Sequence, residues 1–113
     1  MKASTQALAS AALLALLAGA AHAADPKVVK FYQDNCATCH GETGQGTPGL
    51  APAFKGNKFI VSGSEAEIGD TIAKGRDAST KRYKELPSPM PALSMSDTRR
   101  KDLVAYLKTD LQK

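Results

Sequence analysis

One five-residue motif, Cys36-Ala37-Thr38-Cys39-His40, constrains this chain more than any other feature. Two thiols separated by two residues and followed at once by an imidazole are the pattern for covalent attachment of a c-type haem. A redox-active thiol pair, a disulfide or half of a zinc site are the alternative interpretations. Zinc would lack two ligands, because the sequence has no second cysteine pair, and no strand-like alternation surrounds the motif, as a thioredoxin-like site would need. The motif therefore predicts thioether links from Cys36 and Cys39 and iron coordination by His40.

The first 23 residues have the pattern of a secretory signal peptide. Lys2 supplies a positive start, an apolar run follows over residues 7–21, and Ala21-His22-Ala23 is a small-x-small cleavage site. The run is shorter than the ~20 apolar residues that a membrane span needs, although an uncleaved anchor is the alternative. We therefore expect a signal peptide over 1–23, one mature domain over 24–113 and a periplasmic location, which agrees with haem attachment outside the cytoplasm.

The mature chain is small and mildly basic. A domain of this size buries a modest core, so a covalently attached haem would add apolar volume, and we expect a poorly folded form without it. The whole chain has a formal net charge of +4, and removal of Lys2 lowers it by one. This balance favours transient docking to acidic protein surfaces and argues against nucleic-acid binding, which needs a denser basic patch.

Three helices are predicted from their start and stop signals. Asp25, Ser64 and Ser96 are N-cap candidates, and Ser64 and Glu67 together form a capping box. Apolar residues then recur at helical spacing on one face of each segment. The expected helices cover 26 to about 35, 65–74, and 97 to about 111. Residues 41–52 and 76–95 are rich in Gly and Pro and predict loops, and the second is long enough in a small domain to suggest a function, such as wrapping the haem.

The second axial ligand is predicted by elimination. His40 is the only histidine left after signal cleavage, so two histidine ligands within one chain are impossible, and the best remaining donors are Met90 and Met95. Met90 lies between Pro89 and Pro91, which stiffen the backbone. Met95 directly precedes an N-cap, where an apolar side chain normally packs on its own helix. We therefore predict Met90 as the ligand, with Met95 or an open, water-ligated iron as the alternatives.

With its motif near the mature N-terminus, Met90-Pro91 about fifty residues later and a C-terminal amphipathic helix, the mature chain resembles class I monohaem c-type cytochromes of the small bacterial periplasmic kind. The resemblance implies a compact all-α cytochrome c fold, with about three to five helices around one covalently bound haem c. It implies that Tyr32 and Tyr106 lie where the terminal helices cross.

The resemblance also implies a proline whose carbonyl accepts a hydrogen bond from His40. Pro52 is the better match, and Pro48 is the alternative. Arg76, Arg82 and Tyr83 are candidate partners of the haem carboxylates, although each could equally be a solvated loop residue.

These features predict a soluble one-electron carrier rather than an enzyme, because His40 and Met90 would leave no open iron position. Its partners would be redox proteins, contacted through an exposed haem edge that four lysines could surround: Lys55, Lys58, Lys81 and Lys84. We expect a monomer without a membrane span once the signal peptide is removed. The alternative is a haem-bearing subunit of a larger oxidoreductase. A haem sensor or peroxidase fits less well, because no second mature histidine could act near the iron.

Overall fold

A computed structural model describes residues 24–113 of the chain. The predicted signal peptide over 1–23, and with it the predicted domain boundary, lie outside the described residues. The three helices predicted from the sequence are present as α1 (Pro26–Asn35), α4 (Glu65–Lys74) and α5 (Asp97–Lys108). All three predicted N-caps accept a backbone N–H with their side chains, and Ser64 and Glu67 form the full capping box. Local side-chain chemistry therefore fixes where these helices begin.

Two short helices and a terminal turn were not predicted. They are α2 (Ala37–His40), α3 (Lys58–Ser62) and the 3-10 helix η1 (Asp110–Gln112), which replaces the expected continuation of the last helix toward Leu111. Within residues 24–113 there is no strand, only isolated bridges between Thr47 and Ala51 and between Arg76 and Met90. The expected all-α fold is confirmed, and its five α-helices lie within the predicted range.

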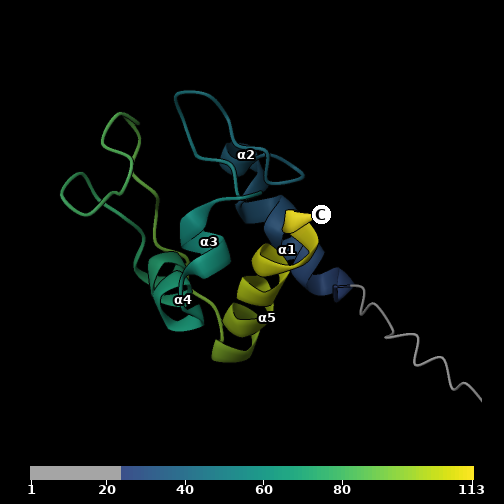
Figure 1. The fold of residues 1–113 in the computed structure, drawn as a ribbon. Coiled ribbons are helices and arrows are strands. Elements are labelled where there is room, and N and C mark those ends of the chain that lie inside the picture. The colour runs from purple at the N-terminus through teal and green to yellow at the C-terminus, as the bar shows by residue number, and fades with distance from the viewer. Residues whose placement is uncertain (1–23) are drawn as a thin grey trace, which may run out of the picture.

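Helix α5 is the centre of the packing. It contacts α1, α3 and α4, and in Figure 1 it lies between α1 and the pair formed by α3 and α4. The core combines aliphatic side chains of α4 and α5 with residues of α1 and α3: Val28, Tyr32, Ile60, Ile68, Ile72, Leu103, Val104 and Leu107. No helix in the described part of the chain is both long and apolar enough to cross a membrane.

Tyr32 joins α1 to the rest of the molecule. Its side chain is fully buried, and its ring packs edge-on against Tyr106 of α5, with 5.5 Å between the ring centroids. The Tyr32 hydroxyl donates a hydrogen bond of 2.7 Å to the carbonyl of Gly41, directly after α2. Burial is the main cause that raises the pKa of Tyr32 above its ordinary value. Tyr32 and Tyr106 thus meet where α1 packs on α5, and Tyr32 also fixes the end of the segment that contains the two cysteines.

Candidate functional site

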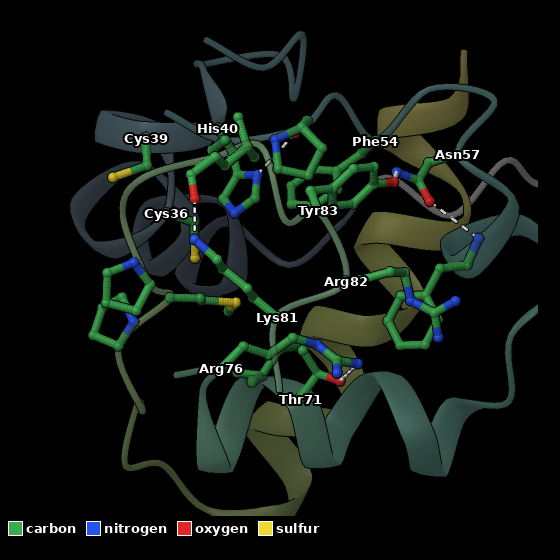
Figure 2. A pocket seen from close by; sticks show the side chains of 18 of the residues that line it. Cys36, Cys39, His40, Phe54, Asn57, Thr71, Arg76, Lys81, Arg82 and Tyr83 are labelled. Atoms are coloured by element: carbon green, nitrogen blue, oxygen red, sulfur yellow. Dashed lines mark hydrogen bonds between the residues drawn. The ribbon is translucent and has the colours of Figure 1, made fainter. Parts of the chain in front are cut away.

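The two cysteines and His40 line one largely apolar cavity. The space inside this cavity, part of it open to solvent, amounts to about 1130 Å³. Side chains from α3, α4, α5 and both long loops complete its wall, including Phe54, Phe59, Ile68, Ile72, Met90, Leu93 and Leu107. Figure 2 shows Cys36, Cys39 and His40 at one end of this pocket and Thr71 and Arg76 of the α4 region at another.

Helices α1 and α2 bring the motif to the cavity. Cys36 is the residue between them, and its backbone N–H donates to Tyr32 O at the end of α1. One short helical turn then brings Cys39 and His40 onto the same wall. Burial, followed by the nearby Cys39 sulfur, raises the pKa of the Cys36 thiol to about 11. Both side chains are free thiols that face one apolar space, which is the arrangement that two covalent links to one planar group require.

The imidazole of His40 is oriented by two neighbours. Its Nδ1 lies 3.0 Å from the carbonyl oxygen of Pro52, and because a carbonyl can only accept, Nδ1 is the donor. The His40 ring also stacks on Phe54, with centroids 4.3 Å apart and 21° between the planes. Burial lowers the pKa of His40, while the bond to Pro52 acts in the opposite direction. The ring is therefore held as the tautomer whose Nε2 is available as a metal ligand.

The loop after the motif brings Pro52 and Phe54 to His40. Gly46 donates its N–H to His40 O, and Phe54 donates its N–H to Gly44 O. At Gly46 the backbone has a φ of 76°, and a Cβ there would lie 2.6 Å from the backbone N of Ala53. Only glycine permits this close approach. Of the two candidate prolines, Pro52 lines the cavity and contacts His40, whereas Pro48 is exposed. Phe54 was not predicted as a site residue, although it follows Pro52 by two residues.

Met90 lines the same cavity from the loop between α4 and α5. Its backbone pairs with Arg76 on both sides, through Arg76 N to Met90 O at 2.8 Å and Met90 N to Arg76 O at 2.9 Å. Met95, the alternative ligand, packs against the core and is not among the described residues that line the cavity. The structure therefore brings Met90, but not Met95, to the cavity that contains His40.

Basic and polar loop residues surround the remaining wall. Arg76, Arg82 and Tyr83, the candidate carboxylate partners, all line the cavity. The guanidinium groups of Arg76 and Arg82 lie over the Phe59 ring, 5.4 Å and 4.3 Å from its centroid, respectively. Tyr83 accepts a 2.7 Å hydrogen bond from the Asn57 side chain, which also caps α3.

Of the four candidate lysines, Lys81 lines the cavity and donates to Leu86 O, whereas Lys55, Lys58 and Lys84 are exposed. Figure 2 shows the Lys81 side chain extending between the motif and the α4 region.

The donor set fits a c-type haem. Two thiols, an imidazole with a free ring nitrogen and a thioether share one cavity, and most of the remaining wall is apolar. Two sulfur atoms three residues apart match the covalent links, and one nitrogen and one thioether are the axial ligands found in cytochromes of this kind. The cationic and hydroxyl side chains at the wall suit carboxylates.

The chain is similar in sequence and in fold to known c-type cytochromes. The family model described as "Cytochrome c" matches residues 27–110 of the chain. The cbb3-type cytochrome c oxidase subunit CcoP of Azospirillum sp. (strain B510) is 35% identical over 51 residues, covering 40% of this chain and 17% of CcoP. The crystal structure of the c-type cytochrome XoxG from Methylobacterium extorquens AM1 aligns with a TM-score of 0.51 and 23% identity, over 76% of this chain and 49% of XoxG. This likeness shows the same fold, and the chain spans half the length of these relatives or less.

Proposed function

The chain belongs to the cytochrome c family and so carries a covalently bound haem c for electron transfer, and we propose that it is an exported one-electron carrier with His40 and Met90 as its iron ligands. The observation that carries this proposal is the meeting of two distant segments. His40 follows α1, Met90 lies in the loop before α5, and both line one cavity. The two cysteines of the motif would form the thioether links.

The bound haem supplies a one-electron couple. His40 and Met90 would both hold the iron, which would raise its reduction potential relative to two nitrogen ligands and would leave no site for oxygen or peroxide. Electron transfer without substrate chemistry is therefore the activity we infer.

The remaining residues would support this role in defined ways. The Pro52 carbonyl accepts a hydrogen bond from Nδ1–H of His40, which would direct Nε2 toward the iron. Phe54 restricts rotation of the imidazole by stacking on it. Apolar side chains from α4 and α5, including Ile68, Ile72 and Leu107, would keep water from the haem. Arg76, Arg82 and Tyr83 are the groups at the wall that could interact with its carboxylates.

We further propose that the partners are redox proteins of the periplasm or of the membrane. The net positive charge of the chain suits brief docking to acidic surfaces, where a small interface allows rapid dissociation. Lys55, Lys58, Lys81 and Lys84 are candidate contacts for such a partner. A monomer released from its signal peptide after residue 23 would be free to diffuse between donor and acceptor.

Spectroscopy of the haem-loaded protein tests the ligand assignment. The oxidised protein should show the near-infrared charge-transfer band of an iron–thioether bond. Met90→Ala should abolish this band, whereas Met95→Ala, the matched control, should retain it. Retention of the band in Met90→Ala and its loss in Met95→Ala would show that the assignment is wrong.

A second candidate function is that of a haem-bearing subunit of a larger oxidoreductase. The partial similarity to CcoP, itself an oxidase subunit, is the observation that favours it. The same cavity residues would serve in either case, so the distinction lies in the interface. A tagged protein purified from its own cells under mild conditions should be recovered without stoichiometric partners if it is a free carrier. Stoichiometric recovery of a catalytic partner would favour the subunit function instead.

A further inference from the structure

The backbone pairing between Arg76 and Met90 does not by itself require an arginine. Any residue could exchange the two hydrogen bonds that join position 76 to Met90. A two-bond bridge in a loop is also weak, because each backbone hydrogen bond contributes only about 1 kcal/mol net. A loop of this length therefore needs further contacts if it is to hold one side chain in a fixed place.

The Arg76 side chain supplies such contacts in two directions. One terminal nitrogen donates a 2.9 Å hydrogen bond to Thr71 Oγ1 in the last turns of α4, and the other donates a 3.0 Å bond to the carbonyl of Thr80. The guanidinium also lies over Phe59 of α3. Arg76 thus links its backbone bridge with Met90 to helices α3 and α4 and to the turn that follows Arg76 in the sequence.

Both acceptors are themselves held in place. The Thr71 hydroxyl donates to Glu67 O within α4, and Ile68 and Ile72 anchor this part of the helix in the core. The carbonyl of Thr80 belongs to a turn fixed by Asp77, whose carboxylate accepts the backbone N–H of Thr80 at 2.9 Å. Arg76 therefore connects Met90 to a core helix, α4, and to a turn that has hydrogen bonds of its own.

From these contacts we infer that Arg76 is a positioning residue for Met90: its guanidinium, held by Thr71 and Thr80, keeps the loop closed so that the thioether stays on the iron. This inference rests on the proposed ligation by Met90. Lysine cannot replace arginine here, because one ammonium group lacks the planar fork that reaches both acceptors at once. Loss of the planar guanidinium should leave the core intact. The Met90 thioether should then dissociate from the iron more often.

Competition by imidazole measures how firmly the thioether is held. In the oxidised, haem-loaded protein, added imidazole displaces a weakly held methionine, and the charge-transfer band disappears. Arg76→Lys and Thr71→Val should each bind imidazole about three- to tenfold more tightly than the unchanged protein, the effect expected for one lost hydrogen bond. Thr71→Ser keeps the hydroxyl and should behave like the unchanged protein.

Arg99→Lys is the matched control. The Arg99 guanidinium lies over the Phe31 ring at 5.3 Å, nearly the distance between Arg76 and Phe59, but it is on α5 and does not line the cavity. This variant should have the same imidazole affinity as the unchanged protein. Unaltered imidazole affinity in both Arg76→Lys and Thr71→Val would overturn the inference.

Amide hydrogen exchange gives a readout that does not depend on the ligand assignment. In Arg76→Lys the Met90 N–H, which bonds to Arg76 O, should exchange about three- to tenfold faster, while the Leu107 N–H in the core keeps its rate. Equal acceleration at both positions would reveal a general loss of stability and overturn the inference. If Met90→Ala retains the charge-transfer band, ligation by Met90 is wrong, and the exchange rate of Met90 alone then decides whether Arg76 holds the loop.

Discussion

At the scale of single residues, Gly75 controls how closely the loop approaches α4. Its φ of 68° lies in the region that favours glycine, and a Cβ there would lie 2.4 Å from Met90 O and 2.7 Å from Pro91 C. Both contacts are with backbone atoms, which cannot move aside as a flexible side chain could. The residue that ends α4 therefore also makes room for the segment that contains the proposed ligand.

Gly75→Ala is expected to displace Met90. Backbone strain alone should cost about 1 kcal/mol, and the clash with Met90 and Pro91 should add to it and weaken the charge-transfer band. Gly49→Ala is the control, because Gly49 also has a positive φ, 74°, but a Cβ there would meet no atom within 4 Å. Denaturant unfolding and near-infrared spectra of the two haem-loaded variants check this. An equal loss of stability with an intact band in both would contradict it.

Asp77 is the second residue whose chemistry can be tested alone. Hydrogen bonds from the Ser79 hydroxyl and then from the backbone N–H groups of Ser79 and Thr80 lower the pKa of Asp77 from 3.8 to about 2. Because the folded pKa is depressed, the ionised carboxylate stabilises the turn above the ordinary pKa, and this contribution is lost as the pH falls toward 2.

Ser79→Ala should raise the pKa of Asp77, because it removes the strongest of these donors. An NMR titration of the Asp77 carboxyl in the reduced, haem-loaded protein measures both values. A pKa near 3.8 in the unchanged protein, or the same pKa in both proteins, would show that the Ser79 hydroxyl does not act in this way.

At the scale of elements, the sequence predicted the long helices and left out the short ones for a physical reason. The helices α1, α4 and α5 begin with side-chain caps and then repeat apolar residues, and both signals are local. Helices α2 and α3 are four and five residues long, too short to display such a repeat. Tertiary contacts hold their ends, such as Tyr32 with Gly41 and Asn57 with Tyr83, and Asn57 also caps α3.

The candidate site likewise contains some features that could be predicted from the sequence and others that could not. The motif and the proline-framed Met90 could be chosen from the sequence because their chemistry is specific. The Arg76–Met90 bridge and the stacking of Phe54 on His40 could not, because both depend on loop conformations set by glycines at positive φ, such as Gly75 and Gly46. The local sequence does not indicate which distant backbone segment will pack closely against each glycine.

The 3-10 helix η1 fastens the C-terminus to the loop beside His40. The Gln112 side chain accepts the N–H of Gly56 at 2.8 Å and donates to Phe54 O at 2.7 Å and to Leu107 O at 3.0 Å. Gln112→Ala should therefore destabilise the haem-loaded protein by about 1–3 kcal/mol in denaturant unfolding.

Gln33→Ala serves as the control for Gln112→Ala. The Gln33 side chain donates a single, exposed hydrogen bond to Glu42 O, so its loss should cost less. Gln112→Glu should fall between Gln112→Ala and the unchanged protein, because a carboxylate can accept from Gly56 but cannot donate to the two carbonyls. Equal stability of the Gln112→Ala and Gln33→Ala variants would contradict the fastening role of η1.

At the scale of the whole molecule, the haem and the protein core share the same walls. Ile68, Ile72 and Leu107 belong to the buried core and also line the cavity, so the core is continuous with the haem site. In a domain of this size, the free energy gained from apolar burial only slightly exceeds the conformational entropy lost on folding. Two thioether links would also restrain the unfolded chain, as other covalent cross-links do.

The chain without attached haem is therefore expected to be largely unfolded. A Cys36→Ser/Cys39→Ser variant cannot form the thioether links and should lose most of its helical far-UV circular dichroism and its cooperative thermal transition. The single variant Cys39→Ser could keep one link through Cys36, and it should regain part of both signals when it is matured with haem. The physical reason is that the apolar faces of α4 and α5, which include Ile68 and Leu107, also line the haem cavity and would be exposed to water without haem. A double variant that unfolds cooperatively with the helix content of the haem-loaded protein would show that the polypeptide core is sufficient by itself.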